Sequence, residues 1–230
     1  MKRGVFVTGT DTGVGKTVAA CALIHALRAA GERVAPMKPI AAGAIQRAGR
    51  WVNEDTLALL EAAGLGIDSV ERVTPLLLRE PMAPHIAAAH EGRRIALAPI
   101  AQAFAAAGSP GDFHVVEGVG GFMVPLDERI DTADLASALG LPVVLVVGMR
   151  LGCLNHALLT ARAIDAAGLR LAGWIANTLD PAMNGLDENV ETLRARLRAP
   201  LLGRLRHRRD LDAVVMARDL DVAPLQALGA

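Results

Sequence analysis

The sequence predicts an α/β protein with a doubly wound, mainly parallel sheet, and three observations support this prediction. Short apolar runs recur along the chain, each bounded by Gly, Pro or Asn, and Ala/Leu-rich segments with helical spacing separate them. The short runs are almost continuously Val, Ile and Leu, as in parallel strands that helices cover on both faces. A length of 230 residues suits one domain, and no repeat or low-complexity linker divides residues 1–230.

The predicted elements alternate regularly. Strands are expected at residues 4–8, 33–37, 113–117, 142–148, 170–177 and 200–205. Helices are expected at residues 16–30, 55–63, 97–107, 132–139, 154–167 and 184–197. Two stretches with weak periodicity, 40–53 and 75–94, are interpreted as active-site loops, with disorder as the alternative. Because ligands of doubly wound sheets bind beyond the carboxyl ends of the strands, the residues that follow each strand are candidates for the site.

The composition excludes several classes of protein. With 52% hydrophobic and 21% charged residues, the chain is not disordered. The formal net charge is zero and aromatic residues make up 3%, which argues against nucleic-acid binding. Cys21 and Cys153 form neither a disulfide framework nor a metal-ligand pair, and no signal-peptide pattern or membrane-length apolar run is found. We therefore expect a cytoplasmic protein that binds neither membranes nor nucleic acids.

A glycine-rich turn between the first strand and the first helix is the strongest motif. Residues 9–17 read GTDTGVGKT, and such a run of small residues lets backbone N–H groups converge on phosphate at the positive end of a helix. This predicts a variant phosphate loop, with Thr10 where the strict spacing has Gly, and hence a P-loop NTPase-like fold that binds a nucleoside triphosphate. Lys16 would bridge the outer phosphates, and the Thr17 hydroxyl would ligate Mg²⁺. The residues assigned to nucleotide binding here are Gly13, Val14, Gly15, Lys16, Thr17 and Val18.

Lysine occurs only at positions 2, 16 and 38, and every other basic residue is Arg. A lysine offers a compact point charge or an amine with a movable pKa, which Arg cannot supply, although chance retention also explains the pattern. Lys38 follows the second strand, at the sheet edge where the phosphate loop is expected. Its ammonium could neutralise charge on a transferred phosphoryl group or on an anionic substrate.

Two carboxylates are candidates to hold Mg²⁺ beside the phosphates. Glu117 closes a buried strand, where a charge is costly without a partner, but an exposed strand-end acid remains the alternative. Asp55 begins a helix, where capping is the ordinary role. Gly118, Gly120 and Gly121 follow Glu117 and could offer N–H groups to an anion, although a plain tight turn explains them equally well.

Two other kinds of chemistry find no support. The six histidines show no metal-ligand spacing and are interpreted as structural. No Ser-His-Asp order or nucleophile elbow occurs, so covalent catalysis is not expected.

Six ordered motifs resemble the dethiobiotin synthetase family within the P-loop group. They lie at residues 7–17, 38–39, 84–85, 116–118, 151–157 and 172–177. The resemblance implies an ATP-dependent ligase of biotin biosynthesis that converts 7,8-diaminononanoate and CO₂ into dethiobiotin. It also implies that a carbamate forms, that ATP phosphorylates it to a carbamic-phosphoric anhydride, and that the second amine closes the ring.

The same resemblance implies roles for individual residues. Thr12, Lys16 and Lys38 match the residues that surround the carbamate and the transferred phosphate. The implied metal ligands are Thr17, Asp55 and Glu117, and Gly118 belongs to the nucleotide site. Asn177 matches an adenine-reading Asn, whose amide both donates and accepts hydrogen bonds.

A two-fold homodimer with composite active sites is a further implication of the family. The segment Gly152, Cys153, Leu154 and Asn155 resembles the one with which the partner subunit holds the carboxylate of the substrate. Three departures from the family pattern stand out: Ala42 where a Ser often touches substrate, Gly13 where some members carry Glu, and an unusual basic segment after Gly203.

Two other functions remain as alternatives. A nucleotide-switched, partition-type ATPase would share the fold, but such proteins usually carry a signature lysine early in the phosphate loop, where Thr10, Asp11 and Thr12 stand here. An amidotransferase-type synthetase would need room for a glutaminase domain and a nucleophilic Cys, and neither is evident.

Overall fold

The computed structural model describes residues 2–47, 49–208, 210 and 212–228, and its centre is a six-stranded sheet. The strand order is β10-β9-β8-β1-β7-β2, and every neighbouring pair is parallel. The strands are β1 (Gly4–Gly9), β2 (Val34–Met37), β7 (Phe113–Glu117), β8 (Val143–Met149), β9 (Leu171–Thr178) and β10 (Leu201–Leu205). The predicted doubly wound, mainly parallel sheet is thus confirmed, and each predicted strand overlaps an observed one.

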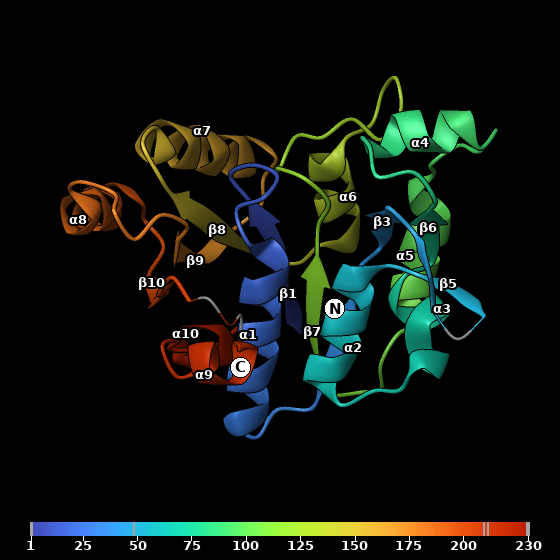
Figure 1. Ribbon diagram of the computed structural model, residues 1–230, viewed down its shortest axis with the longest axis horizontal. Helices are drawn as coiled ribbons and strands as arrows, with labels where there is room; N and C mark the ends of the chain where they lie inside the picture. The colour runs from blue at the N-terminus through green and yellow to red at the C-terminus, as the bar shows by residue number, and fades with distance from the viewer. Residues whose placement is uncertain (1, 48, 209, 211, 229–230) are drawn as a thin grey trace.

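Helices cover both faces of this sheet (Figure 1). One face is covered by α1 (Lys16–Ala29), α9 (Ala213–Ala217) and α10 (Ala223–Gln226), with α2 (Glu54–Ala63) beside α1. The other face is covered by α5 (Leu97–Ala106), α6 (Thr132–Leu139), α7 (Cys153–Ala166) and α8 (Leu186–Arg196). The small helices α9 and α10 follow the last strand and were not predicted, because a single helical turn carries too little periodicity to be read.

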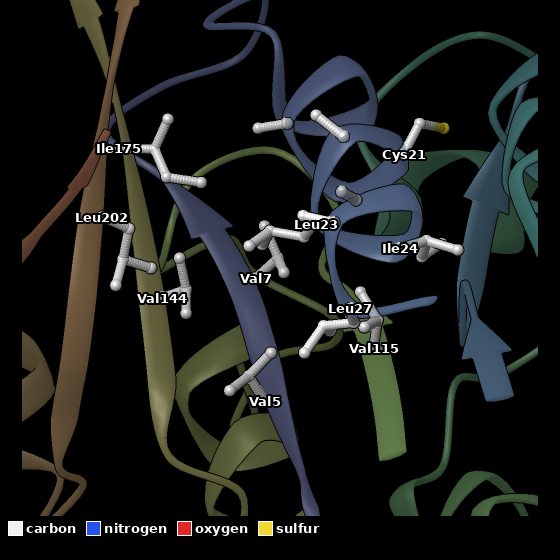
Figure 2. Close-up of a cluster of buried hydrophobic side chains, with 14 of the residues drawn as sticks. Val5, Val7, Cys21, Leu23, Ile24, Leu27, Val115, Val144, Ile175 and Leu202 are labelled. Atoms are coloured by element: carbon white, nitrogen blue, oxygen red, sulfur yellow. The ribbon is translucent and has the colours of Figure 1, made fainter. Parts of the chain in front are cut away.

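The alternation of side chains along β1 separates the two halves of the core. Val5 and Val7 belong to the cluster beneath α1, whereas Phe6 packs with α5 and α6 on the opposite face. Figure 2 shows the first cluster, in which Leu23 and Leu27 of α1 point toward the sheet. All six residues of β1 are buried, as expected for a central parallel strand.

The two stretches that were interpreted as loops contain regular elements, so this interpretation is wrong in part. They include β3 (Ile40–Ala42) with its parallel partner β6 (Leu76–Leu78), the hairpin of β4 (Ile45–Arg47) and β5 (Arg50–Val52), and α4 (Pro84–His90). Between them lie η1 (Ile67–Ser69) and α3 (Val70–Val73). Strands of three residues are too short to show an alternation, which is why the pattern missed them.

Within the described residues, no helix is both long and apolar enough to cross a lipid bilayer.

One buried titratable group lies at the opposite end of β7 from Glu117. His114 is 2% exposed, packs edge to face on Phe104 with ring centroids 5.2 Å apart, and its Nδ1 has no hydrogen-bond partner among the described residues. Burial, with a smaller contribution from the Lys2 charge, lowers the pKa of His114 to about 4. The folded protein therefore holds this ring in its neutral form at neutral pH.

Leu23 offers a direct test of the core beneath α1. It is fully buried, so Leu23→Ala should lower the free energy of unfolding by about 2–5 kcal/mol through lost burial and a residual cavity. Chemical denaturation followed by circular dichroism would measure this. The control Val214→Ala removes an exposed side chain and should change stability by less than about 0.5 kcal/mol. Equal effects of the two variants would contradict the assignment of the core.

His114 makes stability depend on pH with a defined sign. Because its pKa is lower in the folded state than in the unfolded chain, protonation favours unfolding, and stability is lost as the pH falls from about 6.5 toward about 4. The loss from this group is at most about 3–4 kcal/mol. Urea denaturation of wild type and His114→Gln across this window should show a smaller decline in the variant. Parallel declines would show that the ring does not carry the effect.

Candidate active site

The site lies where three neighbouring strands end. β1, β7 and β2 are adjacent in the sheet, and they end at Gly9, Glu117 and Met37 respectively. A cavity of about 680 Å³ opens at this edge. It brings together most of the residues predicted from the sequence: Thr12, Gly13, Gly15, Lys16, Thr17, Val18, Lys38, Ala42, Asp55, Glu117 and Gly120. Other cavities are of similar volume. This one is singled out by the phosphate loop and by three charged side chains that are buried in its wall, Lys16, Lys38 and Glu117.

The phosphate loop has the geometry that anion binding requires. Gly13 and Gly15 adopt the left-handed conformation, with φ of 74° and 83°, and Gly15 is the N-cap of α1. No side chain caps this helix, so the amides of its first turn have no intrahelical partner and remain available to a ligand. A Cβ atom at Gly15 would lie 2.1 Å from Nδ2 of Asn177, so only glycine fits here.

Lys16 is 7% exposed and lies inside the loop. Its Nζ donates a hydrogen bond to the carbonyl oxygen of Asp11 at 3.0 Å. Burial, reinforced by the nearby Lys38 charge, lowers the pKa of Lys16 to about 8. An anion bound in the loop would offset both effects, so this ammonium is suited to phosphate.

Lys38 forms the centre of a buried charge cluster. Its Nζ lies 2.5 Å from Oε1 of Glu117 and 3.0 Å from Oδ2 of Asp55, and it also donates to the carbonyl oxygen of Gly118 at 3.2 Å. Lys38 is 3% exposed and Glu117 is 1% exposed. Burial alone would lower the pKa of Lys38, but the two carboxylates outweigh it and raise the pKa. The ammonium is therefore charged throughout the physiological range.

Asp55 reaches this cluster because α2 begins beside it. The Asn53 side chain accepts hydrogen bonds from the amides of Asp55 and Thr56, and its own amide group donates to the carbonyl oxygens of Ala42 and Gly43. Burial would raise the pKa of Asp55, but Lys38, and further contributions from Thr17 and Lys16, lower it. The capping role considered for Asp55 belongs to Asn53, which leaves the Asp55 carboxylate for the site.

The donors at this point fit a magnesium ion. The Thr17 hydroxyl donates to Oε1 of Glu117 at 2.9 Å, and Oε2 of Glu117 is buried without a hydrogen-bond partner among the described residues. Asp55 adds a second carboxylate. No cluster of three or more His, Cys, Asp or Glu occurs in the described part of the chain, so the site offers two carboxylates and a hydroxyl. Such a sparse oxygen set suits Mg²⁺ that takes its other ligands from phosphates and water.

The turn after β7 faces the phosphate loop. A Cβ atom at Gly120, where φ is 64°, would lie 3.7 Å from Oγ1 of Thr12, so the two residues are close across the cavity. The carbonyl oxygen of Gly118 binds Lys38, and that of Gly121 accepts a hydrogen bond from Thr132. Gly118 and Gly121 support the cavity from outside its lining.

Asn177, on β9, reaches the loop from the other side. Its Nδ2 donates to the carbonyl oxygen of Val14 at 2.8 Å, and the side chain of this loop residue is buried in the core. A role for Asn177 in bracing the loop was not predicted. Only the amide nitrogen is engaged in this bond, and Asn177 is 8% exposed.

The segment from Gly152 to Asn155 does not line the cavity of its own chain. Gly152 caps the start of α7, Cys153 is buried with a side chain that faces Asn189, and Asn155 is exposed. The neighbouring Leu151 is 97% exposed. The placement of this segment at the site of a partner subunit stays a prediction.

Two features of the site were not predicted from the sequence. Arg150, at the end of β8, donates to Oδ2 of Asp11 at 2.5 Å and ties the phosphate loop to the start of α7. Residues 81–84 with Val119 and Val124 form an apolar wall of the cavity. The Pro residues at 81 and 84 were the available signal for a rigid wall, whereas an ion pair between residues 139 positions apart has no local signal.

Known proteins resemble this chain over nearly its whole length. A family model described as an AAA domain matches residues 3–215. The ATP-dependent dethiobiotin synthetase BioD of Aromatoleum aromaticum is 56% identical over 218 residues, which cover 95% of this chain and 96% of the relative. The protein of the same name from Ralstonia nicotianae is 55% identical over 222 residues, which cover 96% of each chain.

Among solved structures, the MinC:MinD cell division protein complex of Aquifex aeolicus matches with a TM-score of 0.54. The match covers 96% of this chain and 87% of the other, at 16% identity, so it shows a shared P-loop fold alone and does not favour a partition-type function. The high identity of the two curated relatives over nearly the whole chain decides the question: this chain belongs to the dethiobiotin synthetase family of ATP-dependent ligases in biotin biosynthesis.

Proposed function

We propose that the chain uses ATP to join 7,8-diaminononanoate and CO₂ into dethiobiotin, with release of ADP and phosphate. One observation supports this most. Lys16, Lys38 and the Glu117 carboxylate line one cavity beside the phosphate loop, and no side chain caps the helix that follows this loop. The reaction needs no nucleophilic side chain, because positioning and charge stabilisation suffice for phosphoryl transfer between bound groups. The names of the 55–56% identical relatives point to the same product.

The triphosphate would lie on the amides of residues 13–18. Lys16 would turn from the Asp11 carbonyl oxygen to the outer phosphates, a move that exchanges a neutral acceptor for a charged one. Asn177 would use its free carbonyl oxygen to accept a hydrogen bond from the adenine amino group, while its amide nitrogen keeps the loop in place.

Thr17, Asp55 and Glu117 would hold Mg²⁺, with the orphaned oxygen of Glu117 as one ligand atom. Magnesium, when bound, neutralises phosphate charge and polarises the transferred phosphoryl group. Lys38 now occupies the space between the two carboxylates, so its ammonium would be shared between them and the reacting anion. The chain thus keeps a positive group at this point with or without the metal.

The bonds in the proposed reaction balance in three steps. One amine of the diamine attacks CO₂, which forms a C–N bond and releases a proton, giving a carbamate. A carbamate oxygen attacks the γ-phosphorus of ATP, ADP leaves, and a carbamic-phosphoric anhydride results. The second amine attacks the carbonyl carbon, the C–O bond to phosphate breaks, a second proton is lost, and the ureido ring closes.

Charge develops on oxygen in each step, and this chain's residues are arranged to meet it. Lys38 and the hydroxyl of Thr12 would bind the carbamate, and the N–H group of Gly120, which lines the cavity, would face the anhydride. Ala42 lines the same cavity but offers only a methyl group. The substrate therefore loses one hydrogen bond at this wall that a hydroxyl side chain would supply.

We further propose a homodimer with composite sites. The segment from Gly152 to Asn155 begins a helix, lies outside its own cavity and adjoins the almost fully exposed Leu151. In a dimer, its first-turn amides would hold the carboxylate of the substrate bound to the other subunit. Arg150 would couple this segment to the phosphate loop through Asp11.

We also propose that residues 1–230 form one domain. The segment that follows β10 returns to the sheet, where Met216 of α9 and Leu225 of α10 join the core beneath α1. A segment that shares the main core has no independent one of its own.

Substrate-dependent release of ADP tests the proposed reaction. Purified protein with diaminononanoate, bicarbonate, Mg²⁺ and ATP should form ADP and dethiobiotin together, as measured by a coupled assay and mass spectrometry. Lys38→Ala should abolish turnover while it retains nucleotide binding, and Lys16→Ala should weaken both. As a matched control, Arg47→Ala removes a charge from the exposed hairpin and should keep normal rates. No diamine-dependent ADP release from wild type would exclude the reaction.

Asp55→Asn tests the magnesium site. The substitution keeps the size of the side chain but removes one anionic ligand, so the Mg²⁺ concentration that half-saturates ATP binding should rise by about tenfold or more. Calorimetric titration of ATP at several Mg²⁺ concentrations would measure this without turnover. Glu54→Gln, one residue earlier on the exposed side of α2, is the control. An unchanged Mg²⁺ requirement would remove Asp55 from the metal site.

A further inference from the structure

A second cavity, of about 590 Å³, lies at the edge of the sheet opposite the active site. It is bordered by the last turns of α7 and α8 and by the residues that lead into β9 and β10. The phosphate loop and Glu117 lie where strands end, whereas this cavity lies where strands begin. It therefore shares no lining residue with the site described above.

Four arginines line this cavity against a single carboxylate. They are Arg162, Arg170, Arg196 and Arg198, and the carboxylate is Asp165. Within the described residues, none of the four guanidinium groups forms an ion pair or a side-chain hydrogen bond, whereas Arg3, Arg50 and Arg93, which line other cavities, each pair with a carboxylate. In a chain with zero net charge, this is a local excess of unpaired positive charge.

Helix ends account for only part of this excess. Arg196 lies in the last turn of α8, where a cation stabilises the negative end of the helix. Arg170 and Arg198 lie outside both helices, in the segments that lead into β9 and β10. The carbonyl ends of α7 and α8 together contribute only about one negative charge, so a net positive charge remains in the cavity.

The floor of the cavity is apolar. It is formed by Leu158, Leu169, Leu171 and Leu197, of which Leu197 is buried and the others are partly buried. A volume of this size exceeds the needs of a bare inorganic anion and falls within the range of pockets for small organic ligands. The cavity thus combines a charged rim with a floor that would cover an apolar body.

We propose that this cavity binds a phosphate monoester with an apolar organic part. A phosphate monoester carries close to two negative charges above its second pKa of about 6, which matches the excess of guanidinium groups. The planar guanidinium fork binds phosphate oxygens in pairs, and the leucine floor covers the organic part. The site does not depend on the proposed reaction, because it uses none of the residues assigned there.

Octyl phosphate is a suitable probe. Inorganic phosphate and octanol are its controls, because each offers only one part of the probe, the charged group or the apolar chain. Calorimetry at pH 8 and low salt should show octyl phosphate binding to wild type, with affinity that falls as salt is added. Each half alone should bind at least about tenfold more weakly, because it lacks one of the two contacts. Equal binding of inorganic phosphate, or of octanol, would overturn the proposal.

Variants locate the binding. Arg170→Gln/Arg198→Gln should weaken octyl phosphate binding by at least about tenfold, since the double variant removes charge-assisted hydrogen bonds to the phosphate. Both side chains are exposed, and an unchanged circular dichroism melting curve would show that the fold is intact. The control Arg47→Gln, and Lys16→Ala in the phosphate loop, should bind as wild type does. Loss of binding in Lys16→Ala but not in the double variant would assign the probe to the phosphate loop and overturn the second site.

A membrane lipid with a phosphate monoester headgroup offers the same two features, a phosphate and an apolar part. A second experiment therefore distinguishes a membrane lipid from a soluble ester. Because the guanidinium groups border a cavity and not a flat face, wild type should not sediment with phosphatidylcholine vesicles that contain phosphatidic acid. Vesicle binding that the double variant abolishes, with no affinity for octyl phosphate in solution, would overturn the assignment to a small soluble ester.

Discussion

The ion cluster that joins Lys38 to Glu117 and Asp55 is the constraint on which the site depends. Lys38 and Glu117 are almost fully buried, and an isolated charge in such a place costs several kcal/mol. Each is tolerated because the other is 2.5 Å away. Glu117 is the last residue of β7 and Lys38 directly follows β2, so the pairing fixes how the ends of these strands lie relative to each other. Loss of either partner leaves a buried charge uncompensated.

The order of the strands turns this local pairing into a complete site. β7 lies between β1 and β2, so Glu117 stands next to the phosphate loop on one side and next to Lys38 on the other. On the far side of β1, Asn177 from β9 and Arg150 from β8 contact the loop at Val14 and Asp11. Side chains therefore hold the loop from both directions, since Thr17 also contacts Glu117 on the β7 side. The amides of Thr10 and Thr12 are engaged within the protein, and those of residues 13–17 are left for a ligand. These side-chain contacts restrain a loop whose glycines would otherwise allow many backbone conformations.

Much of the fold could be predicted because continuous Val/Ile/Leu runs and helical spacing are local signals, and parallel strands bring their carboxyl ends to one edge. The same rule placed Lys16, Lys38 and Glu117 at one point. Two contacts that escaped prediction are non-local: Asn177 with Val14 and Arg150 with Asp11. No pattern along the chain indicates them, because each joins segments that only the folded sheet brings together. The cap by which Asn53 orients Asp55 is different: it joins neighbouring residues, and Asn is a preferred N-cap residue, so a local signal for it was available.

The two lysines of the site show why this chain retains lysine where it otherwise uses arginine. Both are buried within one cavity, yet their neighbours drive their pKa values in opposite directions: carboxylates raise that of Lys38, whereas burial and the nearby Lys38 charge lower that of Lys16. Lys38 is thereby a fixed positive charge that needs no ligand. Among the described residues, no carboxylate lies within ion-pair distance of Lys16, so the more distant Glu117, Asp55 and Asp11 offset its burial only in part, and a bound anion would offset it further. A guanidinium at position 16 would stay charged whatever its surroundings and is too broad to lie within a loop whose amides surround one phosphate. An ammonium on a flexible stem can rest on the Asp11 carbonyl oxygen and then move to the ligand, which makes the unliganded loop stable without filling the place of the phosphate.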